Sequence, residues 1–284
     1  MRFGRIRATV VPLGLALALS VAMVFPALAA TTTVTVTPGN MQGWAFCNEQ
    51  SGVNDCSGAT GSLVAGPATP PLGIGSARLQ TAVPANGQAL ILAAFQGTRL
   101  DAITQLQYST FVTAGGPPQA IALQFNIDSD VTDGVTNYQG RLVFEPYQNP
   151  ALGAVAAGVW QTWSPLQGKW WGTPGGGSRP LTVACPQSAP CTVSQILSQF
   201  PHAGIHATAG AVIFKAGSGW ANPFDGNVDA LTIGTAASTT IFNFEPAIGP
   251  PTNKDQCKDG GWQTFNNPTF KNQGDCVSSV ASGR

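Results

Sequence analysis

The sequence predicts an all-β protein built around a single β-sandwich of the jelly-roll type. Short segments in which apolar and polar residues alternate recur along the chain, and turns rich in glycine and proline separate them. The 34 glycines and 22 prolines interrupt any long helix. Many short strands with little helix are typical of sandwiches and barrels, and we favour the sandwich. A solenoid is disfavoured because no repeat of fixed period is present.

Seven segments show the alternation expected of strands. In the third of them, four apolar side chains from Ile121 to Ile127 share one face, while Gln124 and Asn126 share the opposite face. The seven segments are Gln88–Phe95, Thr104–Phe111, Gln119–Ile127, Gln139–Glu145, Ala209–Lys215, Asn227–Gly234 and Thr239–Phe244.

One short helix is predicted at about residues 192–200. Thr192 followed by Gln195 forms a capping box, in which each side chain hydrogen-bonds the backbone N–H of the other residue. Ile196 and Phe200 contribute to an apolar face, and Pro201 ends the helix.

The first 29 residues have the pattern of a secretory signal peptide. Three arginines precede an uncharged apolar run, Ala8–Phe25, and Ala27-Leu28-Ala29 then fits the small-x-small cleavage rule. A membrane anchor is the alternative, but the polar, threonine-rich segment that follows favours cleavage. We therefore expect a secreted chain that begins at residue 30, with no membrane span after cleavage.

The charge of the chain excludes nucleic acid as a partner. Cleavage removes three of the thirteen basic residues and no acidic residue, which leaves ten against thirteen and a net charge of −3. Phosphate backbones require clustered Lys and Arg, and no such cluster remains. Charged residues make up 9% of the chain, against about 25% in ordinary soluble domains. A surface of hydroxyls and amides suits neutral ligands.

Six cysteines fall in three local pairs, which predicts disulfides in a secreted protein. Proximity favours Cys47–Cys56, Cys185–Cys191 and Cys257–Cys276. A zinc site is disfavoured because no C-x-x-C pair occurs. The last pair brackets residues 253–284, a small unit that we expect its disulfide to hold together because it is too short to bury much core. A proline-rich linker, residues 246–252, separates it from the sandwich domain, residues 30–245.

Four of the seven tryptophans lie in the stretch VWQTWSPLQGKWW, Val159–Trp171. Residues an odd number apart on a strand face opposite sides, so one of Trp160 and Trp163 is expected in the core and the other outside. The same rule separates Trp170 from Trp171. Exposed indole rings are surfaces on which sugar C–H faces can stack.

Two acidic patterns are candidates for chemistry. Asp128, Asp130 and Asp133 cluster in NIDSDVTDG and suggest either a structural calcium site or a turn in which the side chains bond their own backbone. The spacing is not that of an EF-hand loop. Glu145 and Glu245 occupy matching Phe-Glu-Pro contexts and would serve a retaining glycosidase if the carboxylates were about 5–5.5 Å apart. The proline after each Glu instead favours strand ends.

Several stretches together carry a family resemblance: GPATPPLGIGSARL, LDAITQLQYSTF, RLVFEPY, VWQTWSPLQGKWW, TVSQILSQFP and FDGNVDALTIGT. They resemble a widespread class of secreted bacterial β-sandwich domains without an assigned activity, in the style of concanavalin-type jelly rolls and carbohydrate-binding modules. The resemblance spans most of Gly66 to Pro246. The tail CKDGGWQTFNNPTFKNQGDC is similar to a short cysteine-bracketed ending of many bacterial secreted proteins.

These observations favour a non-enzymatic extracellular jelly roll that binds a glycan or another cell-surface polymer. The expected ligand-binding residues are Gln124, Asn126, Arg141, Glu145, Trp163 and Trp171. No cofactor is expected apart from the calcium of the alternative above. The competing hypotheses are a structural or adhesive surface protein without a small ligand, and a glycoside hydrolase that uses Glu145 and Glu245.

Overall fold

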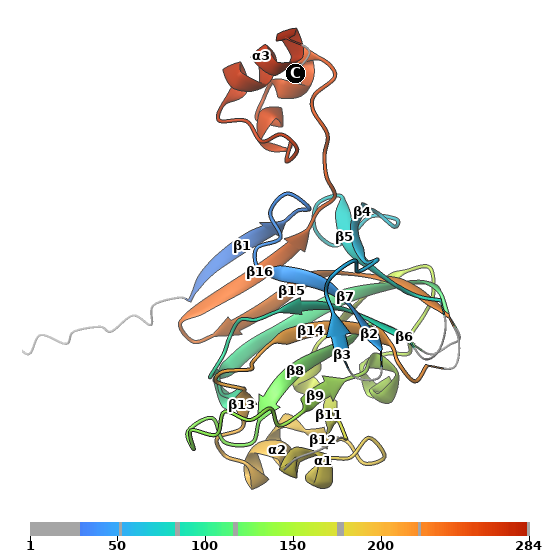
Figure 1. Ribbon diagram of the computed structural model, residues 1–284, viewed down its shortest axis with the longest axis vertical. Coiled ribbons are helices and arrows are strands. Elements are labelled where there is room, and N and C mark those ends of the chain that lie inside the picture. The colour runs from blue at the N-terminus through green and yellow to red at the C-terminus, as the bar shows by residue number, and fades with distance from the viewer. Residues whose placement is uncertain are drawn as a thin grey trace, which may run out of the picture.

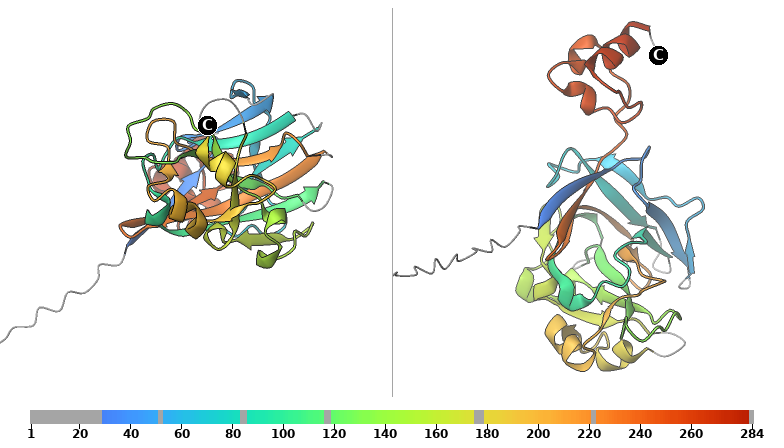
Figure 2. Two further views of the ribbon diagram at one scale, coloured as in Figure 1. Left: turned by 90° about the horizontal axis from the view of Figure 1, so that it is seen from below. Right: turned by 90° about the vertical axis from the view of Figure 1, so that its left-hand side faces the viewer.

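The computed structural model describes residues 29–50, 53–82, 86–115, 119–174, 179–220 and 223–282. The predicted signal peptide lies outside the described residues except for Ala29. Two β-sheets pack face to face, and a small helical unit follows the last strand at the C-terminal end (Figures 1 and 2).

The first sheet has seven strands, with β15 (Phe224–Thr235) at its centre. One edge of β15 pairs with β7 (Ile103–Ala114), and the other edge is shared by β5 (Gly75–Thr81) and β16 (Ser238–Phe244). Three further strands extend the sheet: β10 (Trp160–Trp163) beside β7, β4 (Ser62–Ala65) beside β5, and β1 (Ala30–Val36) parallel to β16.

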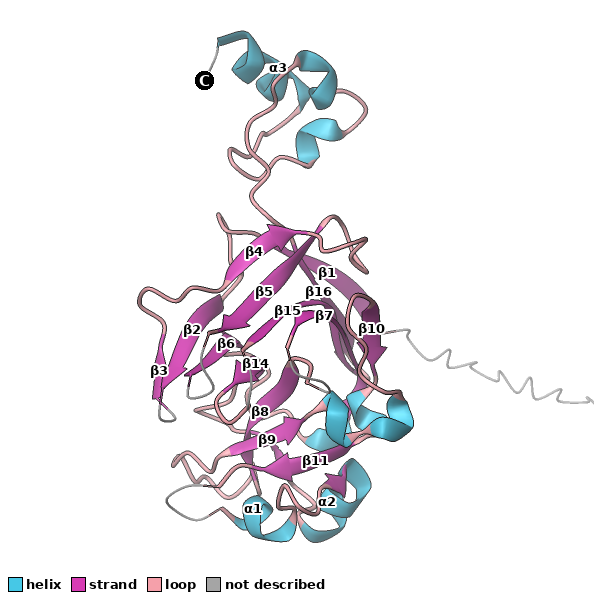
Figure 3. Ribbon diagram, turned by 90° about the vertical axis from the view of Figure 1, so that its right-hand side faces the viewer, coloured by secondary structure: helices cyan, strands magenta, loops and turns pink. Residues whose placement is uncertain are grey.

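The second sheet has nine strands and runs from the C-terminal half of the chain back to the N-terminal half (Figure 3). Every pairing within it is antiparallel. Its order is β12 (Cys191–Thr192), β11 (Lys169–Gly172), β9 (Arg141–Phe144), β8 (Ala122–Asp128), β14 (Val212–Gly217), β6 (Asn86–Leu92), β2 (Trp44–Gln50) and β3 (Val53–Asp55), with β13 (Gly204–Ile205) also paired to β8.

The strand order is that of a jelly roll. In the first sheet β5, β15, β7 and β10 are successive neighbours, and in the second sheet β6, β14, β8 and β9 are successive neighbours. The chain changes sheet from β5 to β6, from β6 to β7, from β7 to β8 and from β14 to β15. This interleaving of two four-stranded sheets is the jelly-roll pattern. The predicted fold class is therefore confirmed.

Inward-facing side chains of the two sheets form one core in which aromatic rings predominate. Trp44 on β2 stacks on Phe214 of β14, with ring centroids 5.8 Å apart, and meets Phe244 of the opposite sheet edge-on at 5.3 Å. The hydroxyl of the fully buried Tyr108 donates to the backbone oxygen of Ile121 over 3.0 Å. Offset and edge-on ring pairs contribute about 0.5–1.5 kcal/mol each beyond the apolar area they bury.

The predicted helix is α2 (Val193–Gln199), and its capping box is present. The Thr192 hydroxyl accepts from the backbone N–H of Gln195, while the Gln195 side chain accepts from the backbone N–H of Thr192. The sequence did not predict α1 (Pro180–Ala184) or α3 (Gln273–Ser282). Six short 3-10 helices complete the elements: Leu100–Ala102, Pro146–Gln148, Pro150–Leu152, Pro165–Gln167, Lys254–Cys257 and Gly261–Gln263.

The three disulfides join the neighbouring pairs, Cys47–Cys56, Cys185–Cys191 and Cys257–Cys276. The last of them lies in the C-terminal unit, where both of its sulfurs are buried against Phe265 in a small apolar cluster of their own. Among the described residues, no helix is long and apolar enough to cross a membrane.

Candidate functional site

The outward face of the second sheet carries most of the predicted ligand-binding residues. Asn126 on β8 lies opposite Arg141 on β9, and Gln124 lies opposite Val143. The alternation of β8 turns Leu123 and Phe125 into the core and leaves Gln124 and Asn126 on the outside. Glu145 follows the last residue of β9 on the same outward side. The outward row of polar residues predicted from the sequence is therefore present.

This outward face is strongly curved. Arg141 on β9 and Glu49 on β2 are separated by β8, β14 and β6, so a flat sheet would place them about 19 Å apart, which is farther than the two side chains span. Their Nη1 and Oε2 atoms are nevertheless 2.8 Å apart. The face is therefore concave, and a small apolar cluster of Ala89, Ala211 and Ile213 forms part of its floor.

Glu49 is the centre of a buried ion network on this concave face. It is 4% exposed and accepts from Arg141 and from the ammonium of Lys215. Burial would raise the pKa of Glu49, but Lys215 and Arg141 together outweigh burial and hold the pKa below its ordinary value. Arg141 Nη1 also lies 3.3 Å from the side-chain oxygen of Gln124. The single carboxylate of Glu49 therefore lies between two cations and ties β2, β9 and β14 together.

Beside this network lies a cavity of about 310 Å³. Three aromatic residues line it, Tyr147, Trp171 and Trp220. Uncharged donors and acceptors form much of the remaining wall, and they are Gln119, Gln124, Thr173, Gln187 and Ser218. The two charged residues that line it are Glu145 and Lys215. In size the cavity falls at the lower end of small-ligand sites, which are roughly 300–1,000 Å³.

Glu145 is held at the wall of the cavity by neutral donors. Its Oε2 accepts from the indole N–H of Trp171 at 2.9 Å, from Gln148 at 3.2 Å and from Gln187 at 3.3 Å. Burial raises the pKa of the Glu145 carboxyl above its ordinary value, and the hydrogen bonds from Trp171 and Gln187 oppose this rise without cancelling it. Glu145 is therefore a buried, oriented acceptor.

The tryptophan stretch divides as the alternation rule predicts. Trp163 and Trp170 are each 1% exposed in the core, whereas Trp160 and Trp171 are partly exposed on the outward faces of different sheets. The prediction of Trp163 as a ligand-binding residue is wrong. The register of β10 places it opposite Tyr108 on the inward face, and its indole N–H donates to Thr110 Oγ1 at 2.8 Å.

Two other predicted residues lie on the concave face but do not line the cavity. Arg141 is 8% exposed and engaged by Glu49. Asn126 donates to the backbone oxygen of Ala209 at 2.7 Å and so fastens a loop. Gln124, Glu145 and Trp171 are the three predicted ligand-binding residues that the structure brings together in one cavity.

The acidic loop after β8 is tightly hydrogen-bonded. Asp128 is 1% exposed and accepts from Gln139 at 2.6 Å, while Asp130 and Asp133 accept from backbone N–H groups two residues ahead. This is the Asx-turn geometry of the alternative interpretation. Across the described ranges, no cluster of three or more His, Cys, Asp or Glu side chains is placed to hold a metal ion.

The two histidines take structural positions near this loop. His206 is fully buried: its Nδ1 accepts from the backbone N–H groups of Thr208 and Ala209, and its Nε2 lies 3.0 Å from the backbone oxygen of Asn137. These contacts assign the tautomer protonated at Nε2. His202 lies on the surface, 3.3 Å from Asp130.

Glu145 and Glu245 do not share a cavity. Glu245 follows β16 in the first sheet, accepts from the backbone N–H of Ile74 and lines a different cavity, beside Phe265 and Asn266 of the C-terminal unit. The glycoside hydrolase hypothesis requires the carboxylates of Glu145 and Glu245 to lie in one cavity, but these two residues line different cavities.

Sequence reasoning did not identify Lys215, Gln187 or Trp220. Alternation along residues 209–215 places Lys215 on the same face as Ile213, so the face on which Lys215 lies could have been predicted from the sequence. The position of Gln187 depends on how the loop closed by Cys185 and Cys191 lies over Glu145, and that of Trp220 on the loop after β14. No local pattern encodes either position.

No protein-family model and no curated protein matches the chain. Among solved structures, the chain is similar to the family 11 carbohydrate-binding module from Clostridium thermocellum in complex with a β-1,3-1,4-mixed-linked tetrasaccharide. The TM-score is 0.35 at 9% identity, over 69% of this chain and 91% of that one.

A second similar structure is the family 11 carbohydrate-binding module of the cellulosomal cellulase Lic26A-Cel5E of Clostridium thermocellum. It matches with a TM-score of 0.32 at 9% identity, over 65% of this chain and 84% of that one. The assignment of a jelly roll rests on the strand order.

Proposed function

We propose that the protein is a secreted, non-enzymatic glycan-binding protein whose ligand occupies the cavity beside Trp171. The observation that carries the proposal is the composition of that cavity: aromatic rings beside amide and hydroxyl groups, with two charged side chains, Glu145 and Lys215, that are both hydrogen-bonded within the protein. A saccharide presents apolar C–H faces and a rim of hydroxyls, and each finds its counterpart among these residues. The disulfides support a location outside the reducing cytosol.

The electrostatics favour a neutral ligand. Lys215 is paired with Glu49, and Glu145 is held by hydrogen bonds from the neutral side chains of Trp171 and Gln187. An anionic sugar would compete with Glu49 for Lys215 and would meet the carboxyl group of Glu145 in the same cavity. A hydroxyl of a neutral sugar can instead bond the amides of Gln124 and Gln187 without disturbing that pair.

Trp171 is the residue proposed to stack on the sugar. Its ring is partly exposed, and its indole N–H is fixed on Glu145, so little rotational freedom is lost when a ligand packs on it. Tyr147 and Trp220 line the same cavity and provide further apolar surface.

The test is affinity electrophoresis of the purified protein in gels that contain soluble neutral polysaccharides, preceded by a glycan array to select them. We expect Trp171→Ala to weaken binding on the order of tenfold, equivalent to about 1.4 kcal/mol. Trp171→Phe should retain most of the affinity because the ring remains.

Trp160→Ala is the matched control. Trp160 is also a partly exposed tryptophan that donates its indole N–H to a carbonyl, that of Pro67 at 2.9 Å, but it lies on the outward face of the other sheet. It should leave binding unchanged. If no neutral glycan bound, or if both Ala variants lost affinity equally, the proposal would be wrong. A structural or adhesive role would then be favoured. If the wild-type protein released reducing ends from a polysaccharide and Glu145→Gln did not, the glycoside hydrolase hypothesis would be favoured.

A further inference from the structure

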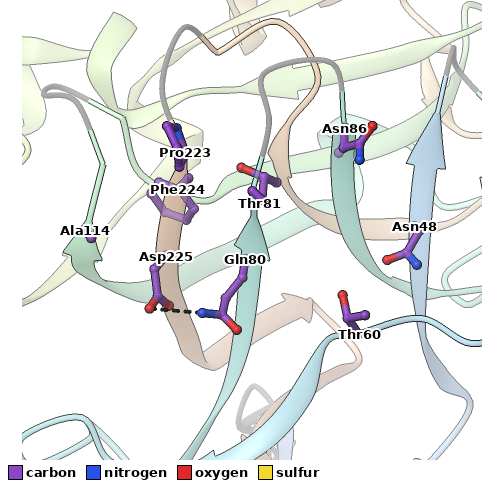
Figure 4. Close-up of a pocket in the computed structure, with 11 residues that line it drawn as sticks. Asn48, Thr60, Gln80, Thr81, Asn86, Ala114, Pro223, Phe224 and Asp225 are labelled. Atoms are coloured by element: carbon purple, nitrogen blue, oxygen red, sulfur yellow. Dashed lines mark hydrogen bonds between the residues drawn. The ribbon is translucent and has the colours of Figure 1, made fainter.

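A second cavity, of about 570 Å³, is lined in part by residues at the end of β5 and the starts of β6 and β15. Figure 4 shows its polar lining, which comes from elements distant in the chain: Asn48, Thr60, Gln80, Thr81, Asn86 and Asp225. Its volume is within the range of roughly 300–1,000 Å³ of small-ligand sites. None of the residues predicted from the sequence to bind a ligand lines it.

The carboxylate in this cavity is fixed and its charge is matched. Arg78 holds Asp225 with two hydrogen bonds, from Nε to Oδ1 at 2.8 Å and from Nη2 to Oδ2 at 2.5 Å. Gln80 donates to Oδ2 of the same carboxylate at 3.2 Å, as Figure 4 shows. Asp225 is therefore an oriented acceptor that carries no uncompensated charge.

Polar groups without a protein partner also line the cavity. The hydroxyl of Thr81, a residue only 4% exposed, has no hydrogen-bond partner among the described residues. The side-chain amide of Asn86 also has no hydrogen-bond partner among the described residues. A buried polar atom left unpaired costs on the order of 1–3 kcal/mol, which a ligand hydroxyl could offset.

Gly217 lies between residues of the two cavities. Gly217 lines the first cavity and has φ +80°, and a Cβ at this position would lie 2.3 Å from the backbone oxygen of Asn86 and 2.6 Å from Thr81 Cγ2. Both are residues of the second cavity. Any side chain here would push into its wall, so the close approach requires glycine.

We infer that this second cavity is a binding site for a neutral saccharide, distinct from the cavity beside Trp171. Its six polar residues offer amide, hydroxyl and carboxylate groups suited to sugar hydroxyls. Arg78, the cation beside it, is engaged by Asp225, so a phosphate or sulfate would meet no uncompensated positive charge. The described residues that line the cavity include no tryptophan, and Phe224 is only 2% exposed. Binding is therefore by hydrogen bonds, which suits one or two sugar units.

The test is two-dimensional NMR of isotope-labelled protein titrated with neutral tetrasaccharides of β-linked glucose, xylose and N-acetylglucosamine, with inorganic phosphate as a charged probe. Side-chain amide signals of Gln80 and Asn86 report on the second cavity, and the indole N–H of Trp171 reports on the first. We expect saturable shifts at Gln80 and Asn86 with at least one tetrasaccharide and none with phosphate. These shifts should persist in Trp171→Ala.

Two variants probe the second cavity alone. Thr81→Val keeps the shape of the side chain, and because the hydroxyl it removes has no partner, folding should be unharmed. It should weaken the site roughly 3- to 10-fold, as expected for one neutral hydrogen bond. Ala114→Phe fills the cavity from β7 and should abolish the shifts at Gln80 and Asn86. Ala237→Phe, on the exposed turn between β15 and β16, is the matched control and should change neither site.

Shifts confined to Trp171, or shifts at Gln80 and Asn86 that survive Ala114→Phe, would overturn the second site and leave the proposed function standing. Saturable binding of phosphate would overturn the neutral ligand. Shifts at Gln80 and Asn86 without any at Trp171 would support the second site and contradict the proposed function. The absence of all shifts would contradict both.

Discussion

The carboxylate of Asp229 accepts the backbone N–H of Phe244 at 3.1 Å, across the point where β15 changes partner from β5 to β16. Its other oxygen accepts the backbone N–H of Leu72, also at 3.1 Å. Asp229 is fully buried, and the next residue, Ala230, has a positive φ of 57° where the strand bulges. The carboxylate thus accepts hydrogen bonds from two backbone N–H groups at the place where the edge of β15 is shared between β5 and β16.

Asp229 should make stability fall as pH rises through neutrality. Burial raises its pKa to about 7, against about 3.9 in an unfolded chain, so the folded protein holds a proton that the unfolded chain releases. The stabilising contribution is full below about pH 4 and is lost as pH rises through about 7, with a loss on the order of 2–4 kcal/mol. Denaturant unfolding of wild type and Asp229→Asn between pH 4 and 8 measures it.

Asp229→Asn should be less stable at acidic pH, because the amide nitrogen cannot accept one of the two N–H groups, and its profile should be flatter over this range. Because the remaining ionisable groups are common to both proteins, the difference between the two profiles isolates Asp229. Parallel profiles would contradict the assignment.

Glu49→Gln should destabilise the fold by roughly 3 kcal/mol. Breaking a buried ion pair on one side leaves uncompensated charge, which costs about 3–5 kcal/mol, and the Gln oxygen still accepts one hydrogen bond. The comparison is Arg99→Gln, which breaks the Arg99–Asp101 pair. Those side chains are 38% and 43% exposed, so its loss should cost about 0–1 kcal/mol. Equal losses in the two variants would show that the concave-face network contributes no more than a surface pair.

Calcium removal should leave the melting temperature unchanged. Asp128, Asp130 and Asp133 are each occupied by hydrogen bonds from their own loop, and the Thr132 hydroxyl lowers the pKa of Asp130, so the loop holds its form without an ion. Calorimetry in excess chelator, with and without added calcium, measures this. A melting temperature that falls in chelator and recovers with calcium would establish the alternative, a calcium site.

Local sequence patterns predicted seven of the strands and helix α2, whereas long-range pairing determined the site. The capping box of Thr192 and Gln195 and the outward position of Gln124 follow from contacts within a few residues. Glu49 and Arg141 are 92 residues apart and meet only because the sheet curves. Among the seven-residue strands, β1, β2 and β5 were not predicted from the sequence. The polar residues of β5 alternate, but the threonine run of β1 has no apolar face at its start.

The local sequence indicates which residues of a strand share a face, but it does not indicate which of the two faces is buried. The sequence indicates that Trp160 and Trp163 face opposite ways, yet which of them is inward depends on the pairing of Trp163 with Tyr108 on β7. This is why the alternation was predicted correctly, whereas the choice of Trp163 as the outward-facing residue was wrong.

The four tryptophans of residues 159–171 should separate by stability. Trp163→Ala and Trp170→Ala each remove a ring that is 1% exposed and leave a cavity in the core, at a cost of about 3–5 kcal/mol. Trp163→Ala also leaves the Thr110 hydroxyl without its donor. Trp170→Ala removes the ring that stacks on Phe125 with ring centroids 5.4 Å apart. Trp160→Ala and Trp171→Ala remove rings that are already partly in water, so each should cost clearly less. Urea unfolding of all four single variants measures the set. A loss at Trp171 as large as that at Trp170 would mean that its ring is structural, and the proposed stacking platform would lose its support.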